Sequence, residues 1–299
     1  MERYSTEGGD LIATPSVSKK IIREIGLPIK KSWGQNFLLE PSVVHKIVAA
    51  AKISASDHVF EVGPGIGGLS QILARQARSL TLIEIDPILS GFLSDYFSTA
   101  EHVQVLNKDA LIMDFAAFAA EKGFASYKLV ANLPYYITTP LLMSFLQRGG
   151  TWSLMVLMMQ KEVAARIMAP PGGKDYGALS LAVQYRARVE KVMDVPPVAF
   201  MPRPEVDSTV LRLENLPRPA VEVADERLFF SLIGAAFAQR RKTLANALAN
   251  GAGVGDKHFW QDCFRAAAID GGRRGETLSL AEFALVANTA QKMIIKDRS

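Results

Sequence analysis

Residues 57–68 read DHVFEVGPGIGG, an apolar stretch that runs directly into a glycine-rich turn. This pattern predicts a buried strand, a tight turn and then a helix over about residues 69–76. A strand, a glycine turn and a helix in that order are typical of the first βαβ unit of a doubly wound sheet. We therefore expect a Rossmann-like α/β domain organised around this segment.

The glycines of this turn fit two cofactor motifs. Gly63, Gly65 and Gly68 satisfy the G-x-G-x-x-G fingerprint of dinucleotide-binding proteins. Gly63, Gly65 and Gly67 equally satisfy the E-x-G-x-G-x-G turn of S-adenosylmethionine enzymes, and Glu61 on the strand supplies its acid. NAD brings a pyrophosphate that favours a helix N-terminus. S-adenosylmethionine brings a sulfonium and an ammonium, which favour an acid near the turn. The turn by itself leaves both cofactors open.

Two further apolar runs predict parallel strands that end in acidic residues. The run 80–85 ends in Glu84 and Asp86, and the run 103–106 leads into Asp109. Glu84 lies about 20 residues past the glycines, where an acid can accept both ribose hydroxyls of either cofactor. Asp109 can accept from the cofactor's adenine amine or can cap the turn that follows it.

The stretch 128–136, KLVANLPYY, carries the residues that predict the chemistry. Residues 129–131 predict a buried strand, after which the pattern breaks at Asn132. An exocyclic amine such as N6 of adenine is a poor nucleophile because its lone pair is delocalised into the ring. If the Asn132 side-chain oxygen and the Leu133 carbonyl accept both N–H groups, that lone pair is freed for a methyl group. Tyr135 offers a face on which a flipped-out base can stack. The alternative is a strand that ends in a proline turn, with its tyrosines packed on the core.

The composition is that of an ordinary globular protein, with 49% hydrophobic and 21% charged residues among 299, a length that predicts about two domains. A single cysteine, Cys263, excludes an internal disulfide. No apolar run reaches the roughly 18 residues of a membrane span, and the acidic N-terminus does not resemble a signal peptide, so we expect a cytoplasmic protein. We expect no metal, because the histidines lack metal-ligand spacing; they are His45, His58, His102 and His258.

The strand pattern stops after Asn215, which predicts a second, all-helical domain. Residues 226–250 are strongly helical, with apolar residues at four-residue spacing on one face, and two shorter helices follow near 256–268 and 280–292. Near the N-terminus, Thr14-Pro15 predicts the start of a separate helix. The expected organisation is an N-terminal tail and helix, the α/β domain and the smaller helical domain: residues 1–30, 31–214 and 215–299.

Positive charge is concentrated outside the centre of the chain. The formal net charge is +4, but residues 32–149 carry 8 Lys and Arg against 10 Asp and Glu, whereas residues 215–299 carry 12 against 9. Arg240, Arg241 and Lys242 are consecutive within the predicted helix 226–250. Such a cluster is either an RNA contact or a solvated face.

One further aromatic residue is a candidate for contact with a base. Phe200 lies at the centre of the proline-rich stretch 196–205, PPVAFMPRPE, which is expected to join two final strands. A stiff support of this kind can hold a second stacking face for a base. The alternative is that Phe200 simply fills the core.

Eight segments taken together resemble, in order, those of the KsgA-type rRNA adenine N6,N6-dimethyltransferases. They cover nearly the whole chain from about residue 12, and Trp33 is a departure where leucine is common. The segments are KKSWGQNFL (30–38), FEVGPGIGGLS (60–70), LIEID (82–86), KDAL (108–111), VANLPYYITTPLL (130–142), MMQKEVAARI (158–167), AFMPRPEVDSTV (199–210) and FAQRRKTLANAL (237–248).

The resemblance implies a class I S-adenosylmethionine methyltransferase domain over residues 31–214 and an RNA- or ribosome-binding helical domain over 215–299. It implies S-adenosylmethionine as the cofactor, with neither a nicotinamide nor a metal. Asn132 would sit between the cofactor and the target base, and Tyr135 would stack on that base. The residues implied to bind the cofactor are Asn36, Leu38, Gly63, Glu84, Asp109 and Asn132.

The family's substrate is a pair of adjacent adenosines in the hairpin loop near the 3′ end of small-subunit (16S) rRNA, methylated in a nearly assembled pre-30S particle. We expect this partner, and a monomeric enzyme. Drug-resistance methyltransferases of large-subunit rRNA share most of the segments, but the full-length match, particularly GALSLAVQY (177–185), favours the small-subunit enzyme. Another alternative is an assembly factor whose methylation is secondary. The intact set Glu84, Asp109, Asn132 and Tyr135 favours activity.

Overall fold

The computed structural model describes residues 10–28, 35–147 and 151–297. Trp33 and the start of the first family-like segment lie outside these residues. Within them, the chain divides into two compact units. The first comprises Met1–Ala164 and Val189–Asn215, and the second comprises Ala165–Arg188 and Leu216–Ser299.

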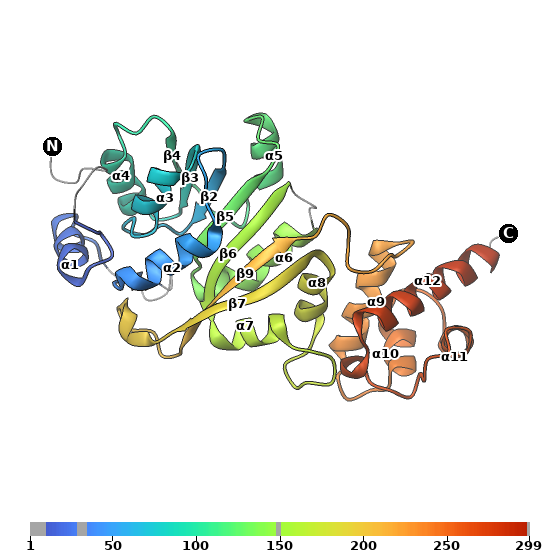
Figure 1. Cartoon of the computed structure of the whole chain (residues 1–299). Coiled ribbons are helices and arrows are strands. Elements are labelled where there is room, and N and C mark those ends of the chain that lie inside the picture. Colours follow the sequence, from blue (N-terminus) through green and yellow to red (C-terminus); the bar gives the residue numbers. More distant parts are fainter. Residues whose placement is uncertain (1–9, 29–34, 148–150, 298–299) are drawn as a thin grey trace. The chain divides into compact units, whose positions relative to one another are not determined.

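The first unit is built on a mixed β-sheet, shown in Figure 1. Within the described residues, seven strands form this sheet in the order β4-β3-β2-β5-β6-β9-β7. The neighbours from β4 to β6 are parallel, and β9 runs antiparallel to β6. This arrangement confirms the predicted Rossmann-like α/β fold. The strands are β2 (His58–Val62), β3 (Ser79–Glu84), β4 (Val103–Asn107), β5 (Tyr127–Asn132), β6 (Trp152–Gln160), β7 (Ala187–Val195) and β9 (Ser208–Asn215).

Strand β2 lies between β3 and β5 in this sheet. The chain passes outward from β2 to β3 and β4 and then returns to the other side of β2 as β5. The strand order therefore reverses at the β2/β5 pair, which is where open α/β sheets bind their ligands. The register pairs Glu61 with Val130 across this point. The glycine turn after β2 and the Asn-Leu-Pro-Tyr turn after β5 are thereby brought to the same edge of the sheet.

Alternate side chains of β2 enter two different apolar layers, as expected for a strand covered on both faces. Val59 belongs to a core cluster with Val44 of α2 and Leu73 of α3. Phe60 contacts the ring of Phe115 of α5 edge to face, at a centroid distance of 5.5 Å. The helices of this unit are α1 (Pro15–Glu24), α2 (Pro41–Ala51), α3 (Ser70–Gln76), α4 (Pro87–Tyr96), α5 (Phe115–Glu121) and α6 (Thr138–Gln147).

A short antiparallel ladder joins two segments that are far apart in the sequence. Strand β1 (Phe37–Leu38) pairs with β8 (Phe200–Met201), with Leu38 opposite Phe200. The backbone N–H of Leu39 extends the ladder by donating to the carbonyl of Ala199 at 2.8 Å. The ladder therefore holds the Gln-Asn-Phe-Leu segment against the proline-rich stretch.

The second unit is helical and has its own apolar core. Phe229, Trp260 and Phe283, which come from three different helices, are each at most 1% exposed and belong to one cluster. In the described parts of the chain, every helix is too short or too polar to cross a bilayer. The helices are α8 (Ala178–Arg186), α9 (Glu226–Ala238), α10 (Leu244–Gly251), α11 (Lys257–Ala266) and α12 (Leu280–Asp297), and α7 (Lys161–Met168) begins in the first unit and ends in the second.

The boundary between the units differs from the predicted one over residues 165–188. The sequence pattern assigned them to the α/β domain and did not predict α8. Tyr176 and Tyr185 are buried in the same cluster as Phe229. The Tyr185 hydroxyl also donates to the carboxylate of Glu226 at 2.9 Å. These contacts attach the segment to the helical unit, although it lies between strands in the sequence.

The prediction of one continuous helix over 226–250 is wrong. Helix α9 ends at Ala238 and α10 begins at Leu244, so the basic cluster lies in a turn between them. Thr243 is extended, with φ −64° and ψ 154°, and serves as the N-cap of α10. The Arg240 guanidinium donates to the backbone carbonyl of Lys174 at 2.8 Å. This bond holds the turn against a neighbouring loop, a contact that helical periodicity cannot indicate.

Candidate functional site

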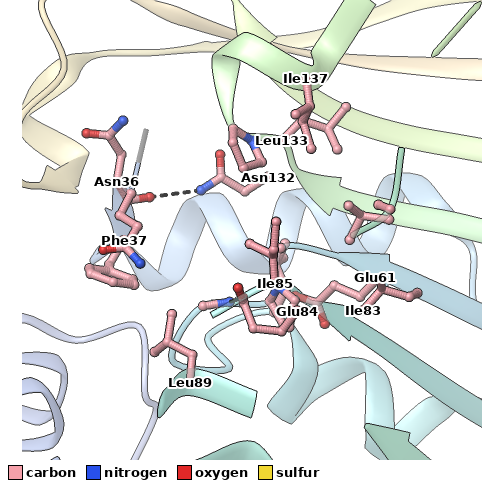
Figure 2. A pocket seen from close by; sticks show the side chains of 18 of the residues that line it. Asn36, Phe37, Glu61, Ile83, Glu84, Ile85, Leu89, Asn132, Leu133 and Ile137 are labelled. Carbon is pink, nitrogen blue, oxygen red and sulfur yellow. Dashed lines mark hydrogen bonds between the residues drawn. The ribbon is translucent and has the colours of Figure 1, made fainter. Parts of the chain in front are cut away.

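A pocket opens at the carboxyl ends of β2, β3 and β5, as the strand order predicts (Figure 2). Its walls come from the Gln-Asn-Phe-Leu segment, the glycine turn, the ends of β3 and β4, and the Asn-Leu-Pro-Tyr turn. The structure thus brings together the predicted residues Asn36, Leu38, Gly63, Glu84, Asp109, Asn132, Leu133 and Tyr135.

The glycine turn needs residues without side chains at two positions. Gly63 and Gly65 have φ values of +65° and +59°, in the left-handed region that favours glycine. A Cβ on Gly63 would lie 3.3 Å from Cδ of Pro134, and one on Gly65 would lie 3.1 Å from the Phe37 ring. The turn therefore packs tightly against both neighbouring walls, and both glycines line the pocket.

Glu84, at the end of β3, is held in place by two backbone groups. One carboxylate oxygen accepts from the N–H of Gly65 at 3.1 Å, and the other accepts from that of Asp86 at 2.9 Å. The side chain is only 5% exposed, and this burial raises the pKa of Glu84 to about 7. Each carboxylate oxygen keeps a second lone pair, so both can still accept from a pair of vicinal hydroxyls.

Glu61, near the end of β2, is a buried acid with unused acceptor capacity. It is 1% exposed and lines the pocket. Burial, and then the nearby charge of Glu84, raise the pKa of Glu61 to about 8. Among the described residues, none donates a hydrogen bond to its Oε2 atom. A buried oxygen of this kind favours a ligand that brings a donor or a positive charge.

Asp109 caps the turn after β4 and also lies at the pocket. One of its carboxylate oxygens accepts from the N–H of Leu111 at 2.8 Å and so caps the turn after β4. The residue also lines the pocket, as does Ile85. The end of β4 is joined to β3 because the Asn107 side chain donates to the Glu84 carbonyl at 2.8 Å.

Asn132 has a fixed amide orientation, because its Nδ2 donates to the carbonyl of Asn36 at 3.0 Å, as Figure 2 shows. Its Oδ1 is consequently the side-chain atom that can accept from a ligand. The following turn is also restrained. The N–H of Leu133 donates to the Met158 carbonyl at 3.1 Å, and the carbonyl of Pro134 accepts from the N–H of Ile137 at 3.1 Å.

Sequence reasoning missed several residues of the pocket. Gln35 donates from its side chain to the Asp86 carboxylate at 3.1 Å, which ties the Gln-Asn-Phe-Leu segment to the start of α4. Tyr136 lines the pocket and is 53% exposed. Both residues are adjacent in the sequence to predicted site residues within the family-like segments. That adjacency is the sequence signal that could have identified them.

The structure places four of the predicted residues outside the pocket lining. Phe200 is 2% exposed and belongs to the same apolar cluster as Leu38. Its stacking role stays a prediction that requires a rearrangement. Arg240, Arg241 and Lys242 are all exposed in the turn between α9 and α10, and Arg240 also donates to the Lys174 carbonyl.

The polar lining identifies the kind of ligand that fits. Glu61, Glu84 and Asp109 all line the pocket, and among the described residues Lys108 is the only cationic side chain that does. This lining suits a ligand with hydroxyl groups and a cationic amine better than a pyrophosphate. The described residues contain no group of three or more His, Cys, Asp or Glu side chains arranged to hold a metal ion. S-adenosylmethionine fits the donors and acceptors present.

The fold and this site together define a class I methyltransferase of the amine-directed type. Three features support this class: the sheet with its antiparallel β9, the acid–glycine turn, and the Asn-Leu-Pro-Tyr turn at the switch point. The chain belongs to the ribosomal RNA adenine dimethylase family, whose model matches residues 26–292.

Relatives agree with this assignment along most of the chain. Ribosomal RNA small subunit methyltransferase A of Geobacillus thermodenitrificans is 47% identical, over 93% of this chain and 96% of the relative. The protein of the same name from Alkaliphilus oremlandii is 43% identical, over 95% and 100%. Among solved structures, a dimethyladenosine transferase from Plasmodium falciparum superimposes with a TM-score of 0.72 at 25% identity, covering 83% of this chain and 95% of that one. The 23S rRNA methyltransferase ErmE shares the fold, with a TM-score of 0.64 at 23% identity over 85% and 99%.

Proposed function

We propose that this chain transfers methyl groups from S-adenosylmethionine to N6 of two adjacent adenosines in the 3′-terminal hairpin loop of small-subunit (16S) rRNA. The product is N6,N6-dimethyladenosine. The observation that carries the proposal is the Asn132 amide, which lines the pocket next to Leu133 and is held there because its Nδ2 donates to the Asn36 carbonyl. The names of the 43–47% identical relatives support the small subunit over the large one.

The residues of the pocket provide a place for each part of the cofactor. Glu84 would accept the two ribose hydroxyls, and Asp109 would accept from the adenine amine. Glu61 would face the ammonium of the methionine end, whose charge would favour the ionised form of this buried acid. S-adenosylmethionine, when bound, supplies the methyl group on a positively charged sulfur. Asn36, Leu38 and Gly63 would close the remaining walls.

Asn132 and Leu133 then act on the target amine. The Asn132 Oδ1 and the Leu133 carbonyl each accept one N–H of adenine N6. This grip draws the nitrogen toward a tetrahedral geometry, and its lone pair becomes available in the direction of the cofactor. An amide cannot take up the released proton at neutral pH, so that proton leaves to water. Tyr135 supports the flipped-out base by stacking.

In the second transfer the target amine is held by fewer hydrogen bonds than in the first. After one methylation N6 carries a single N–H, so one of the two acceptors is left without a donor. An unpaired buried acceptor costs about 1–3 kcal/mol. The second step therefore depends more strongly on stacking by Tyr135.

The RNA partner explains the basic turn of the helical unit. Arg241 and Lys242 are exposed there and would contact phosphates, and Arg240 would join them or support the turn. We place the protein in the cytoplasm, where it would act as a monomer on the pre-30S particle.

Transfer of a labelled methyl group tests the proposal directly. Small and large subunits from cells that lack this methylation are incubated with the protein and methyl-labelled S-adenosylmethionine, and the rRNA is then digested for mass spectrometry. We expect N6,N6-dimethyladenosine at two adjacent positions of the small-subunit RNA only. Label in the large-subunit RNA would favour the resistance-type alternative, and no label in either would contradict both.

A further inference from the structure

The hydroxyl of Tyr135 is bound to a residue for which the reaction has no other use. It lies 2.9 Å from the hydroxyl of Ser208, the first residue of β9. Ser208 is completely buried, whereas Tyr135 is half-buried and lines the pocket. The phenol is protonated near neutral pH, because the ordinary pKa of tyrosine is already alkaline and burial raises the pKa of Tyr135 further. Tyr135 thus lines the pocket while its hydroxyl is bound to Ser208.

Ser208 is itself held in a fixed position. It pairs with Gln160 at the end of β6, and the preceding carbonyl, that of Asp207, accepts from the N–H of Lys161 at 3.0 Å. The start of β9 is therefore a rigid attachment point on the sheet for the Tyr135 side chain.

The backbone and the side chain of Tyr135 are restrained from different directions. The short 3₁₀ helix Tyr135–Ile137 follows Pro134, whose carbonyl accepts from the N–H of Ile137. This fixes the Cα position, but it leaves the side-chain torsions of a half-exposed tyrosine free to change. The bond to Ser208 fixes where the far end of the ring lies.

We propose that Ser208 is a positioning residue, which holds the far end of the Tyr135 ring at the place that the target base needs. The proposal rests on the function proposed above. Because the monomethylated amine has only one N–H, the second transfer depends more on this ring than the first. Removal of the Ser208 hydroxyl is therefore expected to slow the second step selectively.

Four variants of the full-length protein test the proposal: Ser208→Ala, Tyr135→Phe, the combination of both, and Thr209→Val. Each single change at the pair removes the bond between the two hydroxyls and keeps the aromatic ring. We expect each to slow the second transfer by roughly 3- to 10-fold and to raise the monomethyl share of the product. The double variant should be no worse than either single one, because both remove the same interaction.

Thr209→Val is the matched control, because it removes a buried hydroxyl of the adjacent β9 residue, on the opposite face of the strand. It should retain the wild-type ratio of mono- to dimethyladenosine. Binding of S-adenosylhomocysteine, measured by calorimetry, should be the same in all four variants. Thermal unfolding identifies any variant that fails to fold. If Ser208→Ala fails to fold, Tyr135→Phe still tests the pair, because it removes the hydroxyl of the less buried residue.

Independent effects of Ser208→Ala and Tyr135→Phe that multiply in the double variant would overturn the proposal. So would an unchanged product ratio in both single variants. NMR of tyrosines labelled with ¹³C in the ring separates this failure from a failure of the proposed function. Ser208→Ala should change the Tyr135 ring signals without any RNA present, even if the wild-type protein methylates no subunit. Unaltered ring signals would count against positioning.

Discussion

The pocket of the α/β unit and the basic turn of the helical unit use charge in opposite ways. Glu61 and Glu84 are at most 5% exposed, and burial moves the pKa of each well above that of a free carboxyl group. Arg241 and Lys242 are exposed in a turn. Buried charges interact strongly with the few groups around them, whereas exposed charges are screened by water and salt.

This difference predicts where substitution of a single residue has a large effect on function. In the pocket, one group faces one part of a ligand, so substitution of a single side chain removes a defined interaction. In the turn, neighbouring charges contribute similar and partly interchangeable attractions to a phosphate backbone. We therefore expect large, specific effects from substitutions in the pocket and small, cumulative effects from those in the turn.

The largest effect is expected at Asn132. Asn132→Ala removes the acceptor that we propose draws out the N6 lone pair, and it should lower the rate of the first methyl transfer by about 100- to 1,000-fold. Single-turnover transfer to small subunits measures this rate. Asn215→Ala is a control, since the Asn215 side chain also donates to a backbone carbonyl, that of Trp152, at 2.9 Å. An Asn132→Ala protein that keeps a tenth or more of the rate would contradict the assigned role.

Phe200 offers a second test, because the sequence pattern suggested stacking and the structure buries the ring. Phe200→Ala should lower the free energy of unfolding by about 3 kcal/mol, since it opens a cavity in the core cluster. Urea unfolding measures this decrease. Tyr135→Ala, at a half-exposed position, should cost less stability and should instead raise the monomethyl share. If Phe200→Ala keeps its stability and changes that share, Phe200 is the stacking face.

Much of the α/β unit was predictable because strand periodicity and turn residues are local signals. The glycine turn after β2 and the break after β5 were both predicted from sequence, and the strand order brings them together at the switch point of the sheet. The two departures have a common cause. Helix α8 and the interruption of the helix at Arg240 both depend on packing between segments that are distant in the sequence. No local pattern records such packing.

The candidate site shows the same limit at the level of single residues. Residue types indicated that Glu84 and Asn132 are acceptors, because few chemical roles suit an acid or an amide at a strand end. They did not indicate that the Asn36 carbonyl sets the orientation of Asn132, or that Ser208 binds Tyr135. Both hydrogen bonds cross from one chain segment to another, so they depend on the three-dimensional fold.

The buried acids of the pocket predict a pH dependence of stability. The pKa values of Glu61 and Glu84 rise from 4.5 to about 8 and about 7, so the folded protein binds these protons more tightly than the unfolded chain. The contribution is therefore fully present below about pH 4.5 and disappears as pH rises toward 8. The slope is at most about 1.4 kcal/mol per pH unit for each group. Unfolding of the cofactor-free protein across this range measures it.

Substitution separates the two acids. Glu61→Gln imitates the protonated acid and should flatten the dependence, particularly between about pH 7 and 8, where Glu84 contributes little. Asp95→Asn on α4 makes the same acid-to-amide change at an exposed position and serves as the control. A Glu61→Gln protein with the wild-type pH profile would show that Glu61 is ionised in the free protein.

The smallest effect is expected in the basic turn, where the difference between Arg240 and its neighbours can be tested. Arg241→Ala with Lys242→Ala should weaken binding to small subunits and reduce the log–log salt slope by about 0.7–0.9 for each phosphate that is no longer neutralised. Cofactor affinity should not change. Lys292→Ala with Lys296→Ala removes the same charge from exposed positions of α12 and is the matched control. Equal weakening in both double variants would mean that the helical unit attracts RNA through its net charge alone.

Arg240→Ala should in addition lower the melting temperature, because it removes the donor to the Lys174 carbonyl. If it changes only the salt slope, Arg240 acts on RNA like its neighbours.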